Sequence, residues 1–240
     1  MAEKPYHHGD LRAALLAAAE EELTEKGVEG FSLRSVAKRA GVSHAAPAHH
    51  FGDTGGLLTA LAAEGFTQFQ ARLDAREVGA LDNRDRAVRA GLGYLEFALA
   101  RPALFRLIFS SARPNFSSAE LTTAANRAYQ HLVGLVTVLG GGEADVIALW
   151  ATSHGIADLS AGQKLRTLQG KSPEERERMI RAVLLRYLPG AAVYTGSPAS
   201  GFGWSITIWL CTRATAGFGK RRWWIRVFSA GRSAHQTRSR

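Results

Sequence analysis

Apolar residues recur at spacings of three and four along most of this chain, and this period predicts α-helices. In residues 10–26 one apolar stripe is expected to face the core, while the three glutamates 20–22 stay mostly in solvent. Asp10 is expected to cap this helix and Gly27 to end it. The stripe consists of Leu11, Leu15, Ala19 and Leu23.

Residues 31–51, FSLRSVAKRAGVSHAAPAHHF, predict two short helices joined at Gly41, which is a helix-turn-helix. Ser32 is expected to cap the first helix and Ser43 the second. Gly41 stands where the chain reverses, a position that often needs a positive φ. The first helix carries Leu33, Val36, Ala37 and Ala40 on its buried face, and Arg34, Lys38 and Arg39 on the face toward solvent or a polyanion. In DNA-binding versions of this motif the second helix enters the major groove and reads base edges with its first residues.

The later apolar periods predict more helices and no strand-helix alternation, so the expected fold class is all-α. Ser117 with Glu120, and Ser172 with Glu175, are typical of capping boxes at helix starts. The two last helices have wide apolar faces, which suit either a second copy of the chain or the protein's own core. One long helix is expected directly after the turn at Gly52-Asp53. The further expected helices span residues 85–99, 103–109, 117–140, 143–168 and 173–187.

Charge and cysteine content change this picture only at the C-terminus. Nearly all of the net charge of +9 comes from the tail, because residues 195–240 hold eight Lys/Arg and no acid. The single Cys211 excludes a disulfide framework and favours a cytoplasmic location. The polar start and the absence of a long apolar run predict neither a secretory signal nor a membrane span.

Two groups of residues have the side chains of a metal site and of a hydrolase active site, but their spacing does not suit either one. His7, His8, His44, His49 and His50 invite a metal site, yet adjacent helical histidines diverge and no cysteine or well-spaced carboxylate completes the set, so no metal and no cofactor is expected. Ser153, His154 and Asp158 are the residue types of a hydrolase triad, but one helix cannot align all three, so no enzymatic activity is expected.

Several motifs together resemble the TetR family of bacterial repressors. YHHGDLR at 6–12, SLRSVAKRAGVSHAAP at 32–47 and HHF at 49–51 resemble the family's DNA-binding domain. ARPALFRLIFS at 100–110 and LWATSHGIADL at 149–159 resemble a subgroup whose ligand domain is marked by a Trp, a His and a Gly, here Trp150, His154 and Gly155.

The resemblance implies a helix-turn-helix domain in residues 1–56, with the motif at 32–51, and a helical ligand-binding and dimerisation domain in residues 57–190. It implies a cytoplasmic homodimer on a pseudo-palindromic, double-stranded DNA operator, released by a small-molecule effector whose identity the sequence does not give. The implied DNA contacts are Arg34, Ser43, His44, Ala45, His49 and Thr54. The implied pocket residues are Phe105, Phe109, Trp150 and His154. For Trp150 and His154, packing in the core is the alternative explanation.

Two positions depart from the family pattern. The family usually has a tyrosine where this chain has Ala48 and a lysine where it has Thr54, and both commonly contact phosphate. Because the salt dependence of DNA binding grows by about 0.9 per phosphate contact, we expect weak binding with a shallow salt dependence. A small-molecule-binding protein with weak or lost specific DNA binding is therefore an alternative function.

The basic, tryptophan-rich tail, residues 191–240, differs in composition from the rest of the chain. A frameshifted or misread C-terminus, an accessory basic arm for phosphate binding and a membrane-surface patch are three explanations that stay open. The second of them gives a further alternative function, a nonspecific basic DNA-binding protein that acts through its tail.

Overall fold

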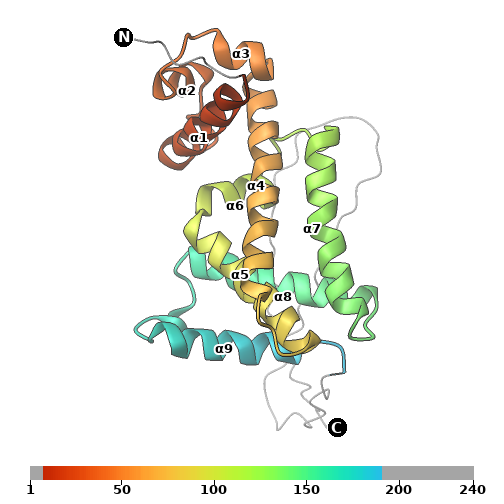
Figure 1. The fold of residues 1–240 in the computed structure, drawn as a ribbon. Coiled ribbons are helices and arrows are strands. Elements are labelled where there is room, and N and C mark those ends of the chain that lie inside the picture. The colour runs from red at the N-terminus through yellow and green to blue at the C-terminus, as the bar shows by residue number, and fades with distance from the viewer. Residues whose placement is uncertain (1–7, 191–240) are drawn as a thin grey trace, which may run out of the picture. The chain divides into compact units, whose positions relative to one another are not determined.

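The computed structural model describes residues 8–190, with side chains from Leu11 onward, and this part of the chain is helical without strands (Figure 1). The predicted all-α class is confirmed. The predictions for the tail and for His7 concern residues outside the described range, and the side chain of His8 is not described either.

The first three helices form a small bundle at one end of the long helix α4 (Figure 1). They are α1 (His8–Lys26), α2 (Leu33–Arg39) and α3 (Ala46–Phe51), and α4 spans Thr54–Glu77. The stripe predicted for α1 is buried, with Leu15, Ala19 and Leu23 at most 1% exposed. Asp10 is not a cap, because α1 already includes His8.

The helix-turn-helix forms as predicted in its first half and differs in its second. The Ser32 hydroxyl accepts a hydrogen bond from the amide of Ser35, and Gly41 has a φ of +68°. Ser43 does not cap α3: its carbonyl accepts from the amide of Ala46 in a turn, and the cap residue is Ala45. The helix starts this late because Pro47 fits its second position, where the missing N–H costs no helical hydrogen bond.

The remaining helices pack around α4 and beside one another (Figure 1). They are α5 (Asn83–Ala100), α6 (Pro102–Ser110), α7 (Ala119–Thr137), α8 (Glu143–Ala161), the 3₁₀ turn η1 (Arg166–Leu168) and α9 (Pro173–Arg186).

Two predicted boundaries among these helices are wrong and one is confirmed. Ser117 does not cap α7; Ser118 precedes it, and Glu120 pairs with Arg12 instead of closing a box. The helix expected over 143–168 ends at Ala161, because Gly162 and the left-handed Gln163 (φ 53°) turn the chain. The Ser172–Glu175 capping box of α9 is present.

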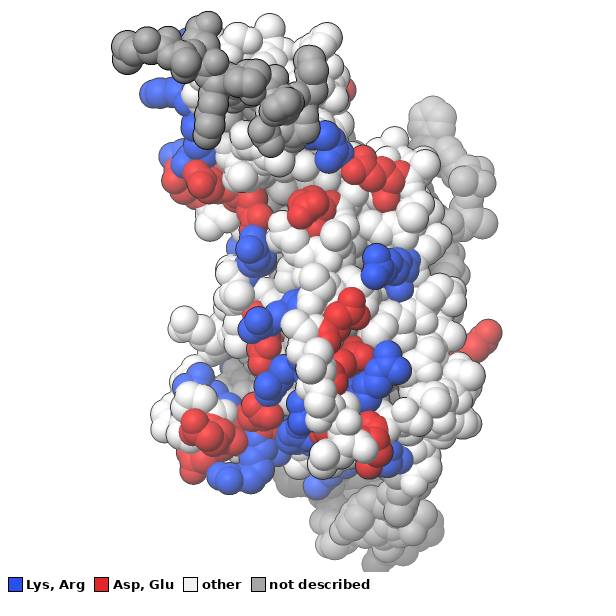
Figure 2. Space-filling view, viewed as in Figure 1, with Lys and Arg blue, Asp and Glu red and all other residues white. Residues whose placement is uncertain are grey.

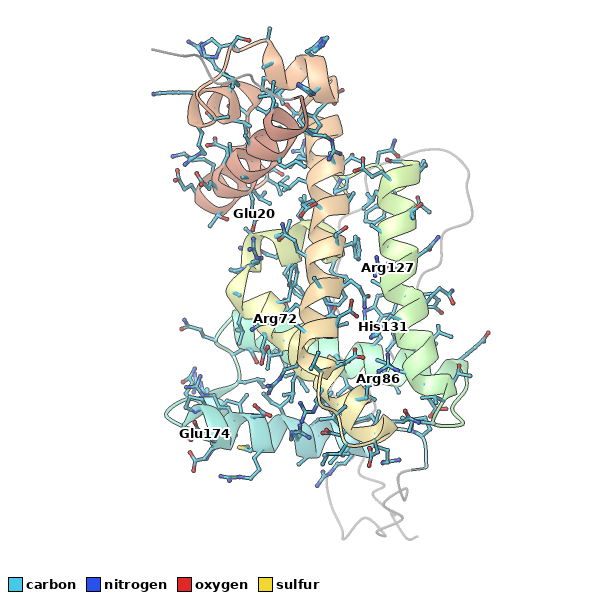
Figure 3. All side chains as sticks on the ribbon, viewed as in Figure 1. Glu20, Arg72, Arg86, Arg127, His131 and Glu174 are labelled. Carbon is cyan, nitrogen blue, oxygen red and sulfur yellow. The ribbon has the colours of Figure 1, made fainter. Side chains whose placement is uncertain are left out.

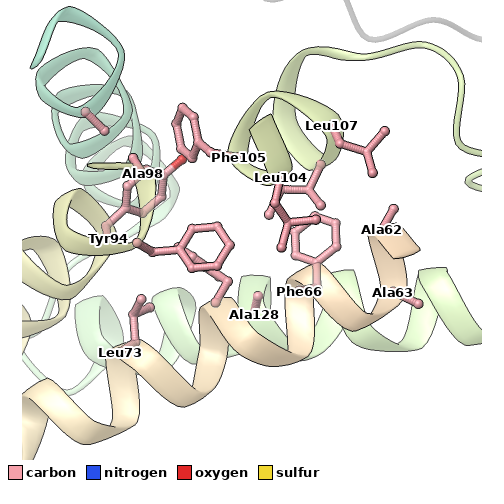
Figure 4. Packing of buried hydrophobic residues seen from close by; sticks show 14 of the residues in the cluster. Ala62, Ala63, Phe66, Leu73, Tyr94, Ala98, Leu104, Phe105, Leu107 and Ala128 are labelled. Atoms are coloured by element: carbon pink, nitrogen blue, oxygen red, sulfur yellow. The ribbon is translucent and has the colours of Figure 1, made fainter. Parts of the chain in front are cut away.

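The core lies along α4, and Figure 4 shows buried side chains of α4, α5, α6 and α7 meeting there. The backbones of α4 and α5 come close at Gly93, where a Cβ atom would lie 3.2 Å from Cα of Leu73. A larger residue at Gly93 would have to push against backbone rather than against a flexible side chain. This close approach fixes how α4 and α5 lie against each other, and both helices contribute residues to the wall of the cavity described below.

Charged side chains of both signs are interspersed over the lower helices, while much of the surface over α7 is uncharged (Figure 2).

Two expectations about charge in the N-terminal bundle are corrected. Glu22 is 2% exposed rather than in solvent, and Arg39 turns back onto α1. The guanidinium of Arg39 contacts the carboxylates of Glu21, Glu22 and Glu25. This contact pins α2 to α1, and the hydrogen bond from Arg39 lowers the pKa of Glu25.

Helix α9 is held to α5 by an ion pair between Arg181 and Asp85, with Nη1 and Oδ1 2.8 Å apart. Arg89 contacts the other oxygen of the Asp85 carboxylate at 2.7 Å. The hydrogen bond from Arg181, more than any other contact, lowers the pKa of Asp85 to about 2. Since this pKa is depressed, the contact stabilises the fold above the ordinary pKa of 3.8 and is lost as the pH falls toward 2.

Within residues 8–190, no helix combines the length and the apolar character needed to cross a bilayer.

Candidate functional sites: the helix-turn-helix surface and an apolar cavity

The six residues expected to contact DNA lie on α2, around α3 and at the start of α4. Arg34 is exposed on α2, and Ser43, His44 and Ala45 are exposed in the turn that leads into α3. His49 is exposed on α3 itself, and Thr54 is the half-buried first residue of α4. The structure thus gathers these positions at the helix-turn-helix end of the molecule.

A tight turn between α3 and α4 sets the angle at which α3 is presented. Gly52 has a φ of +78°, and the Asp53 carboxylate caps α4 by accepting from the amide of Gly56 at 2.7 Å. A Cβ atom on Gly56 would lie only 1.9 Å from the carbonyl oxygen of Phe51. Gly56 is therefore required by the close packing of the turn.

The two departures from the family pattern are both at accessible positions. Ala48 is exposed on α3, and Thr54 directly follows the cap residue Asp53. A tyrosine and a lysine at these positions would extend beyond the short side chains present. The chain therefore lacks, at both positions, the side chains that the family resemblance leads us to expect at phosphate contacts.

An apolar cavity of about 320 Å³ opens among α4, α5, α7 and α8. Aromatic and aliphatic side chains form most of its wall, and the polar members are few. Its aromatic wall residues are Phe66, Phe69, Tyr94, Phe109, Phe116, Tyr129 and Trp150. Asn126, His131 and Ser153 supply its polar atoms together with the Tyr94 hydroxyl. A mainly apolar wall with a few placed polar groups is typical of small-molecule sites.

Two of the four predicted pocket residues, Phe109 and Trp150, lie in the wall of this cavity. Phe105 is 2% exposed and packs behind the wall, where its ring stacks on His154 with the centroids 5.4 Å apart. His154 does not line the cavity and contacts two residues of its wall, Tyr94 and Phe109. The structure therefore places Phe105 and His154 as supports of the wall rather than in it.

His154 supports the cavity wall through a hydrogen bond between its Nδ1 and the Tyr94 hydroxyl, 2.8 Å apart. Burial raises the pKa of Tyr94 and lowers the pKa of His154, so that the phenol keeps its proton and the imidazole is neutral near pH 7. The hydroxyl donates to Nδ1 when the imidazole proton is on Nε2, and it accepts from Nδ1–H in the other tautomer. This bond fixes the orientation of the Tyr94 ring, which stacks on Phe109 across the wall.

Three arginines on and beside α6, which could have attracted an anionic ligand, pair with glutamates or face solvent. Arg101 pairs with Glu20 of α1, and Arg113 pairs with Glu29 in the loop after α1. Arg106 is exposed on α6. None of the three lines the cavity, so they give no support to an anionic ligand; Arg101 and Arg113 instead hold the segment around α6 against the helix-turn-helix bundle.

Sequence reasoning missed a polar cluster at the edge of the cavity. Glu77 on α4 is nearly buried; its Oε1 lies 2.5 Å from Nε2 of His131 on α7, and its Oε2 lies 2.7 Å from Nε of Arg86. Glu77 and His131 are 54 positions apart, so no local spacing links them. The available signal was a glutamate at the end of an apolar helix, which needs a partner when buried.

A helix-turn-helix joined through one long helix to a helical domain with an apolar cavity is the arrangement of a DNA-binding transcription regulator. Comparisons with known proteins identify the family of regulators. Residues 15–61 match the family described as bacterial regulatory proteins, tetR family, and residues 87–183 match the tetracyclin repressor-like C-terminal domain. The chain belongs to the TetR family of transcription regulators, a family that is generally not enzymatic.

Solved structures agree with this assignment. A protein of unknown function from Rhodococcus sp. RHA1 is 36% identical, with 78% of this chain and 99% of that chain covered and a TM-score of 0.66. A TetR-like transcriptional regulator from the same organism is 17% identical over 77% and 99% of the two chains, with a TM-score of 0.57. The multidrug binding protein EbrR, complexed with imidazole, is 19% identical over 80% and 100%, with a TM-score of 0.55. No curated protein sequence matches the chain.

Proposed function

We propose that this protein is a ligand-responsive repressor that binds a pseudo-palindromic operator as a homodimer in the cytoplasm. The observation that carries the proposal is the exposure of Ser43, His44, Ala45 and His49 on and before α3, at the far end of the helix that lines the cavity. In helix-turn-helix proteins these positions face base edges in the major groove.

The apolar outer faces of α8 and α9 support a dimer. In α9, Ile180 and Leu184 face the core, while Met179, Val183 and Tyr187 next to them are 38–48% exposed. On α8, Ile147 and Trp150 lie on one side of the helix and are 47% and 40% exposed. An apolar stripe beside a stripe that is already buried is suited to a second copy of the same helices, and a symmetric operator requires such a dimer.

The cavity supports an uncharged, largely apolar effector. Its wall offers several aromatic rings and few polar groups, and the described arginines point away from it or are paired. The neighbour EbrR is a multidrug binding protein, which fits a cavity of this composition.

The cavity is also connected to the DNA-binding end. The backbone amide of Asn115, next to Phe116 in the cavity wall, donates to the Thr59 hydroxyl near the start of α4 at 2.9 Å. A ligand that displaces Phe116 would alter this contact and so the placement of the recognition helices. Typical coupling free energies between such sites are about 1–3 kcal/mol.

A DNA titration tests the proposal. The native chain is expected to prefer a duplex from its own upstream region over random duplex, and His44→Ala is expected to lose the preference, because direct base contacts are worth about 1–3 kcal/mol. Fluorescence anisotropy at several salt concentrations measures both duplexes. Ala75→Gln, at an exposed position of α4 far from the helix-turn-helix, serves as the control and should behave as the native chain. Equal binding of the two duplexes by the native chain would instead favour the second candidate, a small-molecule-binding protein without specific DNA binding, to which the missing groups at Ala48 and Thr54 point.

The pocket is tested by filling it. Ala125 lines the cavity from α7, and Ala125→Phe is expected to abolish binding of N-phenyl-1-naphthylamine, a neutral apolar dye, because the new ring occupies the space the dye needs. Dye fluorescence is the measurement. Ala75→Phe adds the same ring at an exposed position of α4 and should leave binding intact. Unchanged dye binding in Ala125→Phe would place the effector site elsewhere.

A further inference from the structure

Among the residues that the structure describes, one group of potential metal ligands comes together between α4 and α7. It consists of Asp74 and Glu77, one turn apart on α4, and His131 on α7. One ligand atom from each lies within 4.8 Å of the other two. Figure 3 shows His131 in the region between the two helices, with Arg86 below it.

The spacing suits a small divalent cation after modest side-chain movement. Metal–ligand bonds of about 2.0–2.1 Å put neighbouring ligands of a tetrahedral zinc site about 3.3 Å apart. Asp74 is exposed, so its carboxylate is free to rotate inward. Oε1 of Glu77 and Nε2 of His131 are already 2.5 Å apart, and a cation would take the place of the hydrogen bond between them.

Gln70, one turn before Asp74, supplies an independent observation. Its side chain is 5% exposed; Nε2 donates to Oδ1 of Asp74 at 2.7 Å, and Oε1 has no hydrogen-bond partner. The amide nitrogen and oxygen are nearly isosteric, so a half-turn of the amide places Oε1 beside the Asp74 carboxylate. In the structure Nε2 faces this carboxylate, and Oε1 is the buried atom without a partner. Beside a bound cation, the half-turn would let Oε1 act as a fourth ligand.

We propose that Gln70, Asp74, Glu77 and His131 form a binding site for a divalent transition-metal cation, with Zn²⁺ as the best match. One imidazole and three oxygen donors favour a borderline cation such as Zn²⁺ or Co²⁺ over Mg²⁺, which prefers oxygen donors alone. Arg86 holds the second oxygen of Glu77 and orients the carboxylate from outside the site. Bound there, the cation joins α4, which begins at the helix-turn-helix, to α7, which forms a wall of the cavity.

Co²⁺ tests the site because its visible absorption reports both occupancy and coordination geometry. The full-length chain is expected to bind one Co²⁺ with the intense band of a low-coordinate site, and Zn²⁺ but not Mg²⁺ should displace it. Asp74→Asn and His131→Gln should each weaken Co²⁺ binding by about 10- to 100-fold. His44→Gln removes an exposed histidine in the helix-turn-helix and should leave the band unchanged.

The outcomes divide cleanly. Loss of the band in Asp74→Asn, with its retention in His44→Gln, supports the site. No band in the native chain, an unchanged band in Asp74→Asn, or a band lost in His44→Gln would overturn it, the last by placing the cation on the helix-turn-helix histidines. Circular dichroism checks the fold. If His131→Gln does not fold, Asp74→Asn decides alone, since Asp74 is exposed and its replacement leaves the core intact.

Discussion

The double variant Ala48→Tyr, Thr54→Lys is expected to bind duplex DNA with a much steeper salt dependence than the native chain. Each substitution adds one phosphate contact per subunit, which makes four in a dimer. At about 0.9 per contact, the slope of log K against log salt concentration becomes more negative by about 3.6. Between 50 and 200 mM salt, the double variant should therefore lose about 100-fold more affinity than the native chain loses.

Both positions accept the change without loss of fold. Ala48 is exposed, and the cap from Asp53 to Gly56 keeps the start of α4 in place. A lysine in the first turn opposes the helix dipole by only about 0.3–1 kcal/mol. Fluorescence anisotropy over a salt series gives the slopes. Ala75→Lys adds the same charge to an exposed site about 30 Å further along α4 and should leave the slope unchanged. A double variant with the native slope would show that this face of α3 does not meet the DNA backbone.

The second large effect concerns stability: Phe69→Ala is expected to lower the free energy of unfolding by about 3–5 kcal/mol. Phe69 is 4% exposed, and its ring meets Tyr94, Phe97 and Phe109 edge to face at centroid distances of 5.0, 5.4 and 5.5 Å. These rings adjoin a cavity that is already open, so the space left by the phenyl group has few side chains able to close it. Since whole domains are stable by about 5–15 kcal/mol, the loss is a large share of the total.

Urea denaturation followed by circular dichroism measures this loss. Phe116→Ala is the matched control, because Phe116 also lines the cavity but is 46% exposed. Its replacement should change the stability by no more than about 0.5 kcal/mol. If Phe69→Ala proves as mild as the control, the aromatic wall must rearrange to fill the gap.

The sequence predicted the helices well where a local signal exists. Ser32, Gly41 and the Ser172–Glu175 box each act within four residues, and all three appear as expected. It failed where two local signals compete. Ser43 is a good cap residue, but Pro47 sets the helix start two residues later, and Gly162 ends α8 although apolar residues continue beyond it.

Contacts between distant segments were harder to predict. The sequence pattern puts Glu22 and Arg39 on the polar faces of their helices. Only the packing of α2 on α1 brings the two side chains together. The same holds for Glu77 with His131, and for Tyr94 with His154, whose partners are 54 and 60 positions away. Of the predicted pocket, Phe109 and Trp150 reach the cavity wall, but the depth at which Phe105 and His154 lie depends on how α5, α6 and α8 cross.

Trp150 lines the cavity and is also 40% exposed on the outer face of α8, so a single indole ring belongs to two surfaces. In a dimer built through that face, the two binding sites would share part of their walls with the subunit boundary. An occupant of one subunit would then be sensed by the other, and the response to effector concentration would be sigmoidal rather than hyperbolic.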